Sequence, residues 1–162
     1  MYRNQNNDQI VFHAQCGADA VTKSGNMSTE NITGQLYAWH TGSMPKVWAR
    51  YYRDRVSAGR VIQVIFSYST PIAWKDRDYG WIIPSVSYSV TTSAKHQSQL
   101  YRLGGRHVYV PWDATADDLA RVMDERMVFV TDYRGRATGT KPGPRYATDE
   151  MLAVFARNAG KA

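Results

Sequence analysis

The sequence predicts an α+β protein, in which a small, mostly antiparallel sheet packs with about four helices in a single domain. The 162-residue length suits one domain with a sizeable core. Hydrophobic residues make up 43% of the chain, as in ordinary globular proteins, so a folded chain is expected. Short β-branched stretches with a two-residue period alternate with amphipathic stretches that are bounded by capping residues and glycine.

Composition divides the chain into four regions. We expect a weakly patterned segment at 1–30, an α+β core at 31–131, a basic Gly/Pro-rich loop or arm at 132–147, and a helix at 148–162 that packs on the core. In the first region, "IVFHA" (10–14) indicates a short strand and "TKSGNMSTEN" (22–31) a loop. The core opens with "GQLYAWHTG" (34–42), which indicates a strand between glycines.

A helix is expected between Ser43 and Gly59. The serine, Pro45 and the closing glycine stand in the order that is typical of helix ends. One face of this helix carries an apolar and aromatic stripe, and the other face carries Arg50 and Arg53. The stripe consists of Val47 or Trp48, Tyr51, Tyr52 and Val56.

Strands follow this helix. "RVIQVIFSYST" (60–70) is β-branched and apolar, and Pro71 should end the strand or place it at an edge. "KDRDYG" (75–80) has turn chemistry, which predicts an antiparallel hairpin. "SVSYSVTT" (85–92) alternates strictly, which predicts a further strand with serine and threonine hydroxyls on one face.

The remaining elements show clear end signals. Ser93 is placed to cap a helix from Ala94 to about Leu103, and "RHVYVP" (106–111) indicates a strand. "WDATADDLARVMDERM" (112–127) predicts a helix capped by Asp113 or Thr115, with Leu119, Val122, Met123 and Met127 as its buried stripe. "MVFV" (127–130) continues this helix or starts a last strand, and Thr148 caps the final helix.

Several classes of protein are disfavoured by composition. No apolar run reaches the ~20 residues that a membrane span needs, and the polar N-terminus does not resemble a signal peptide. A single cysteine, Cys16, cannot form an internal disulfide. We therefore expect a cytoplasmic protein that does not contact a membrane.

Positive charge is the strongest compositional signal. The net charge is +6 and the pI is about 9.5, which favours nucleic acid or an acidic protein as a partner. Residues 46–60 and 133–145 are strongly basic, whereas residues 113–126 carry five carboxylates and two arginines. The expected surface is dipolar, with basic regions beside an acidic helix.

Familiar catalytic motifs are missing. The sequence has no GxxxxGK[ST], GxGxxG, HExxH or GxSxG motif, and "GRATGTKPG" (135–143) lacks the ending of a phosphate-binding loop. The four histidines are not paired at helical spacing, so ordinary structural or surface roles are favoured over a metal site. We expect no cofactor and no metal.

The junction between residues 85–92 and the helix at Ser93 is the best catalytic candidate. Free N–H groups at a helix start bind anions, Lys95 would add positive charge, and His96 would act as general acid or base. Thr91, Ser89 and Tyr68 would supply further polar contacts. The simpler interpretation, which we favour, is a strand with a solvent-facing hydroxyl side that leads into an ordinary helix cap.

A basic surface is the second candidate site. Arginines beside Trp48, Tyr51, Tyr52 and Trp74 could contact phosphates while the rings stack on bases, although these rings also fit a core stripe. The predicted nucleic-acid contacts are Arg50, Arg53, Lys95, Arg134, Arg136, Lys141 and Arg145.

A recurring pattern appears at "SYSTPIA" (67–73) and "YSVTTSAKHQ" (88–97), with "NITGQLYAWHTGSMP" (31–45) upstream. Over about residues 25–105, the chain resembles a family of small uncharacterised proteins from actinobacteria and their phages. The resemblance implies a small accessory protein, suggests phage origin, and places Tyr68, Thr70, Thr92 and His96 in one recurring hairpin. It implies no activity, so no catalytic residue is transferred.

The leading hypothesis is a non-enzymatic protein that binds nucleic acid through its basic surface. A metal-independent ribonuclease centred on His96 is the first alternative, and a phage module that binds an acidic host protein is the second. Self-association into a homo-oligomer is a further alternative, because a strand edge near Pro71 or Pro84 could pair with a second copy.

Overall fold

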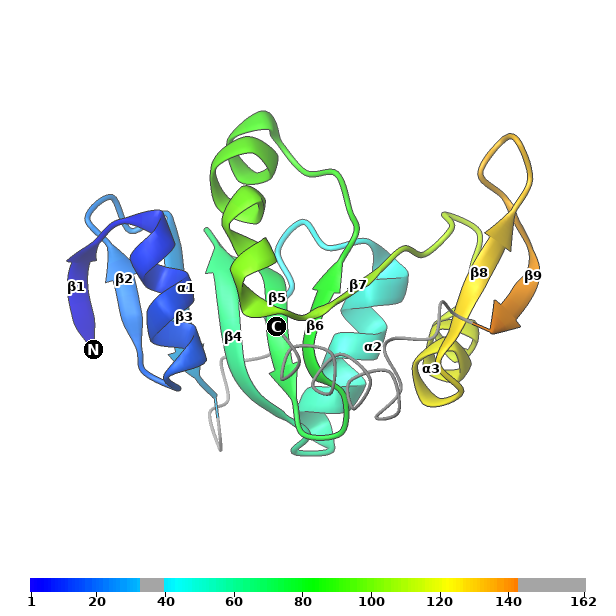
Figure 1. The fold of residues 1–162 in the computed structure, drawn as a ribbon, viewed down its shortest axis with the longest axis horizontal. Helices are drawn as coiled ribbons and strands as arrows, with labels where there is room; N and C mark the ends of the chain where they lie inside the picture. The colour runs from blue at the N-terminus through cyan, green and yellow to red at the C-terminus, as the bar shows by residue number, and fades with distance from the viewer. Residues whose placement is uncertain (33–39, 143–162) are drawn as a thin grey trace, which may run out of the picture.

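A seven-stranded sheet forms the centre of the molecule in the computed structural model, which describes residues 1–32 and 40–142 (Figure 1). The strands lie in the order β1-β2-β3-β4-β5-β6-β7. They are β1 (Tyr2–Gln5), β2 (Ala20–Thr22), β3 (Met27–Asn31), β4 (Val61–Ser67), β5 (Thr70–Asp76), β6 (Gly80–Pro84) and β7 (Arg106–Val108). A separate hairpin joins β8 (Met127–Thr131) to β9 (Ala137–Pro142).

The predicted α+β class is confirmed, but the prediction of a small, mostly antiparallel sheet is wrong. The sheet is mixed, since β1 pairs with β2 and β6 with β7 in parallel, while the strands from β2 to β6 are antiparallel. Parallel neighbours need a long crossover between them. The helix α1 (Asn7–Gln15) supplies one crossover, and a helical stretch at 92–103 supplies the other.

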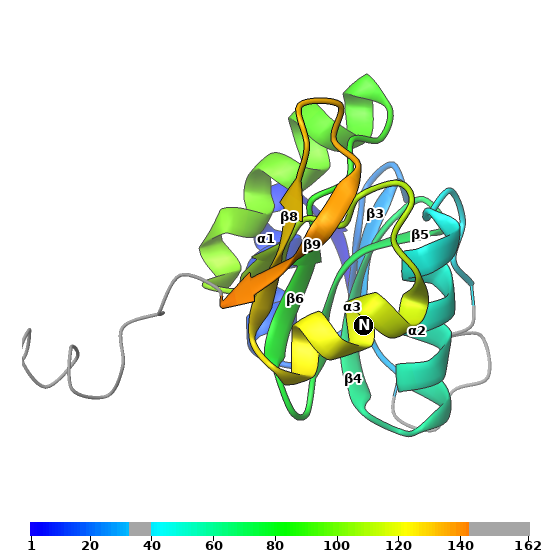
Figure 2. The ribbon, with the colours of Figure 1, turned by 90° about the vertical axis from the view of Figure 1, so that its right-hand side faces the viewer.

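Helices cover both faces of the sheet (Figure 2). The helices α2 (Lys46–Ser57) and α3 (Ala116–Asp124) pack on one face around Trp48, Trp74 and Met123. On the other face, α1 and the 3₁₀ helix η3 (Gln97–Leu103) pack around Ile65 and Leu100. Two cores therefore lie on opposite sides of β4, β5 and β6.

The first 30 residues contribute more order than the sequence predicts. Residues 10–14 belong to α1 and not to a strand, and the Gln9 side chain accepts from the Asn6 N–H at the start of this helix. Ile10, Val11 and Ala14 then share its buried face. The predicted loop 22–31 contains β3, whose strand character comes from its pairing with β4 rather than from its polar composition.

The predicted strand 60–70 is broken by a tight turn at Tyr68. β4 ends at Ser67, and β5 begins at Thr70 and contains Pro71. This proline lies opposite Phe66, beside an irregularity in the ladder, where a missing N–H is tolerated. β5 lies between β4 and β6, so Pro71 is not at a sheet edge. Pro84 is not at an edge either, because it pairs with Val108 in β7. The prediction of an exposed strand edge near these prolines is therefore wrong.

Residues 85–92 are not a strand, although their alternation is strict. Residues 85–89 are irregular, and a helical stretch begins at residue 90 and continues as the π-helix η2 (Thr92–His96) and then as η3. Two backbone N–H groups here bond to nearby serine side chains and not to a neighbouring strand. Ser89 Oγ accepts from the Thr92 N–H, and Ser93 Oγ accepts from the Tyr88 N–H. Ser93 therefore does not cap the start of the helix, which ends with Gly104 in the left-handed conformation, as predicted.

Other elements follow the prediction. The helices α2 and α3, the hairpin of β5 and β6, and the strand β7 are confirmed, with β7 shorter than expected. Residues 127–131 form β8, and the predicted loop at 132–147 contains β9. The predicted strand 34–42 falls mostly outside the described residues, and the predicted helix at 148–162 falls entirely outside them. Every helix in the described parts of the chain is too short or too polar to cross a bilayer.

Candidate nucleic-acid interface

The aromatic residues of α2 belong to the core. Trp48, Tyr51 and Tyr52 are buried, and Trp48 and Tyr52 pack edge-on against Trp74. Burial raises the pKa of both tyrosine hydroxyls well above the ordinary value. These rings cannot stack on bases, so the structural interpretation of this stripe is the correct one.

The arginines of the 46–60 region differ in what they contact. Arg50 is exposed, and Arg53 donates to the Thr41 hydroxyl at 2.8 Å. Arg55 forms a forked ion pair with buried Asp76 and also contacts Asp78, which pairs with Arg60. The hydrogen bond from Arg60, and to a smaller extent the one from Arg55, lowers the pKa of Asp78 to about 2. Two of the arginines are therefore occupied by carboxylates.

The junction around His96 is closed rather than open. His96 is only 1% exposed, and its Nδ1 lies 2.7 Å from Ser67 Oγ, which lies 2.9 Å from Thr92 Oγ1. Burial, with a smaller effect from Lys95, lowers the pKa of His96. The N–H groups of Thr92 and Ser93 already donate to Ser89, so the helix start is not free to bind an anion.

The predicted catalytic residues meet only in part. The Tyr68 ring lies 5.9 Å from the His96 ring and is exposed, whereas Lys95 is exposed and Thr91 is partly buried. Ser67, which the sequence did not single out, is the actual partner of His96. Of the four positions of the expected recurring hairpin, Tyr68, Thr92 and His96 lie together here, although Thr92 and His96 are helical. The Thr70 hydroxyl instead accepts from the Ser43 N–H.

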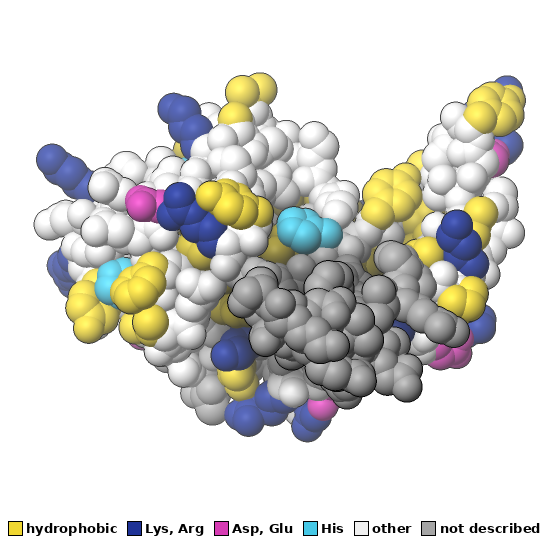
Figure 3. Space-filling model, in the orientation of Figure 1, with side chains coloured by type: hydrophobic (Ala, Val, Ile, Leu, Met, Phe, Trp, Pro, Cys, Tyr) yellow, Lys and Arg dark blue, Asp and Glu magenta, His cyan; other side chains and the backbone are white. Residues whose placement is uncertain are grey.

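The β8–β9 hairpin holds exposed cations on a structured turn. Asp132 accepts from the backbone N–H groups of Arg134 and Arg136 and from Arg136 Nε, which lowers the pKa of Asp132. Arg134 lies over the Tyr133 ring, 5.1 Å from its centre, and Lys141 is exposed. Basic and hydrophobic side chains cover the tip of the hairpin (Figure 3). Arg145 lies outside the described residues.

Three exposed aromatic side chains come from this hairpin and from the loop after β7. Tyr133 is 87% exposed, Trp112 76% and Tyr109 51%. Two contacts join the loop after β7 to the hairpin: the Ala137 N–H donates to Asp113 at 3.0 Å, and the Tyr109 hydroxyl lies against Gly135. We call Tyr109, Trp112, Tyr133 and Arg134 the aromatic platform. Trp112 and Tyr133 lie among proline, aspartate and glycine and outside any apolar period, and this placement is the sequence signal that could have indicated the platform.

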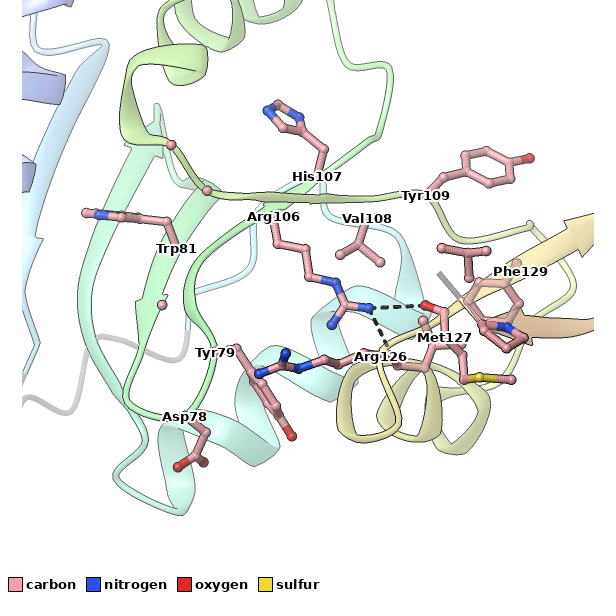
Figure 4. A pocket seen from close by; sticks show the side chains of 16 residues that line it. Asp78, Tyr79, Trp81, Arg106, His107, Val108, Tyr109, Arg126, Met127 and Phe129 are labelled. Atoms are coloured by element: carbon pink, nitrogen blue, oxygen red, sulfur yellow. Dashed lines mark hydrogen bonds between the residues drawn. The ribbon is translucent and has the colours of Figure 1, made fainter. Parts of the chain in front are cut away.

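A cavity of about 840 Å³ lies between β7 and β8, next to the platform (Figure 4). Arg106 points into it and donates to the backbone carbonyls of Val122, Met123 and Met127. Its guanidinium therefore satisfies carbonyl groups at the C-terminal end of α3. Tyr109 points away from Arg106, toward the hairpin. Among the described residues, no three His, Cys, Asp or Glu side chains are placed to hold a metal ion.

Comparison with known proteins identifies the family. Residues 16–108 match a family of unknown function, DUF8033, and cover more than half of the chain. The chain belongs to this family. Its membership confirms the expected resemblance to an uncharacterised family, over strands β2 to β7 and the helices between them. No curated protein and no solved structure matches the chain. The matched region of this DUF8033 member ends one residue before Tyr109, so the platform lies beyond it.

Proposed function

We propose that this DUF8033 protein binds nucleic acid and that the β8–β9 hairpin makes the principal contact. The observation that supports this is the exposure of Arg134 and Lys141 on a two-stranded arm, where neither forms an ion pair with a described residue. Free cations on an arm can approach phosphates closely, and the net charge of +6 adds a long-range attraction.

The other predicted cations are less suited to the same contact. Lys95 lies in η2, on the side of the sheet opposite to Arg50 and Arg53. The acidic helix α3 packs between α2 and β8, so its carboxylates separate the α2 arginines from the hairpin. A nucleic acid that follows the hairpin would therefore not lie along α2 or η2.

The test is a salt titration of binding to labelled oligonucleotides, in single-stranded and duplex form, by fluorescence anisotropy. Binding should be measurable at ~50 mM salt and should weaken steeply as salt increases, because released counterions drive it. Arg134→Ala and Lys141→Ala should each weaken binding and lower the slope of log K against log salt by about 0.7 to 0.9.

Arg50→Ala and Lys95→Ala are the matched controls, since each removes one exposed charge from another surface. They should change the slope by much less than the hairpin variants. Equal effects from all four variants would contradict a contact localised on the hairpin, and absence of binding to either oligonucleotide at ~50 mM salt would refute the function.

Two alternatives from the sequence stay predictions without support from this geometry. A ribonuclease centred on His96 needs an accessible imidazole, whereas this one is buried against Ser67. Labelled RNA incubated with EDTA and the protein should therefore stay intact. An acidic host protein as partner, in a phage accessory role, would give a stoichiometric protein complex and no oligonucleotide binding.

A further inference from the structure

We infer that the nucleic acid is single-stranded and that its bases stack on the aromatic platform. This inference rests on the proposed function and adds to it the form of the ligand. It starts from the exposure of Trp112 and Tyr133, which are 76% and 87% exposed. Tryptophan is usually well buried on average, and an exposed cluster of rings marks an interaction site.

The loops that carry the platform are held in place by backbone and carboxylate contacts, and Arg134 lies over the Tyr133 ring. Asp113, next to Trp112, accepts from the Ala137 N–H, and Asp132, next to Tyr133, orders the turn of the hairpin. Tyr109 lies against Gly135, and a side chain there would come within van der Waals contact of its hydroxyl. The rings are therefore presented by two connected loops, and Trp112 and Tyr133 remain largely exposed to a ligand.

Charge on the platform points to nucleic acid rather than to an apolar partner. Arg134 lies over the Tyr133 ring, and Lys141 lies further along the same hairpin, in β9 opposite Val128, so one arm carries both a ring and cations that can meet phosphates. Rings stack on bases only where the bases are unpaired, because in a duplex each base face is already covered by its neighbours.

A second largely exposed tyrosine with an arginine over its ring provides a control. Tyr101 is 68% exposed and Arg102 lies 5.6 Å from its ring centre, but this pair belongs to η3 on the opposite face of the sheet. An effect caused by any exposed Tyr–Arg pair would appear equally at Tyr101 and Tyr133. An effect of the platform would appear only at Tyr133.

The experiment compares a labelled oligothymidylate with a duplex of the same length at one salt concentration. The single strand should bind more tightly, and Trp112→Ala should weaken its binding by about 5- to 160-fold while the duplex affinity changes little. Tyr133→Ala should act in the same direction, Trp112→Phe should retain part of the affinity, and Tyr101→Ala should leave it unchanged. Because Trp112 and Tyr133 are exposed, these variants should unfold at the same temperature as the parent protein.

Tryptophan fluorescence gives a second readout. Trp48, Trp74 and Trp81 are buried, so quenching by the single strand should be reduced in Trp112→Phe. Equal affinity for both forms, with no effect of Trp112→Ala, would overturn the inference but leave salt-dependent phosphate binding intact. No affinity for either form would instead remove the proposed function.

Discussion

Ser67 and His96 form a buried hydrogen bond at the place where the sequence offered a candidate catalytic site. Their 2.7 Å contact joins the end of β4 to η2, and Thr92 extends it. Since the imidazole is buried, its neutral form is favoured and its pKa is lowered. The pair therefore ties the crossover helix to the sheet, and its titration should be visible as a pH dependence of stability.

At the residue scale, the free energy of unfolding should fall as the pH decreases from about 6.5 toward 5. The unfolded chain binds a proton at His96 near pH 6.5, whereas the folded chain resists protonation, so the unfolded state gains protons first. His96→Asn, which keeps a polar atom near the Nδ1 position, should flatten this dependence in urea unfolding curves. His107→Asn at an exposed position is the control, and an unchanged pH dependence in His96→Asn would contradict the assignment.

At the element scale, α3 owes its start to Thr115 and its position to a buried stripe. Thr115 Oγ1 accepts from the Asp118 N–H, while the Asp118 carboxylate accepts from the Thr115 N–H. The hydrogen bonds from Thr115 lower the pKa of Asp118. Leu119, Val122 and Met123 then pack against the sheet, and α3 in turn supports β8. The start of the helix that separates the basic surfaces is thus determined by the capping box at Thr115–Asp118.

Thr115→Ala should lower the free energy of unfolding by about 1 kcal/mol, because it leaves a helix N–H without its capping oxygen. Thr115→Ser keeps the hydroxyl and should recover most of this loss. Denaturant titration of the three proteins measures the difference. A Thr115→Ser variant as unstable as Thr115→Ala would show that the threonine methyl, and not the cap, is responsible.

At the scale of the whole molecule, the family match is shorter than the folded unit. Residues 16–108 leave out α1, whose Ile10 and Val11 fill one core, and α3, whose Leu119 and Met123 fill the other. Both cores are therefore shared between the matched region and its flanks. The two sides of the sheet depend on segments that lie at opposite ends of the described chain.

A chain restricted to residues 16–108 should not unfold cooperatively, because both faces of the sheet would expose apolar side chains. Circular dichroism and thermal unfolding of this fragment, beside the full chain as control, measure the outcome. A cooperative transition close to that of the full chain would show that α1 and α3 are dispensable for the core.

The sequence by itself determined the locally encoded parts of this protein. The 3.6-residue period determined α2 and α3, turn chemistry determined the β5–β6 hairpin, and composition determined the positive charge. The capping signal is correct at Thr115 for α3, whereas α2 starts after Pro45 without a side-chain cap from Ser43. These signals act over a few residues, so they can be read without the rest of the fold. The alternation at 85–92 misled because serines that bond locally mimic the pattern of a strand.

Only the tertiary structure decided what these parts do together. It buried His96 against Ser67, 29 residues away, and paired Arg55 with Asp76. It also brought the loop that carries Trp112 to the hairpin that carries Tyr133. Such contacts depend on how strands order themselves in the sheet, and strand order comes from long-range packing that no short stretch of sequence encodes.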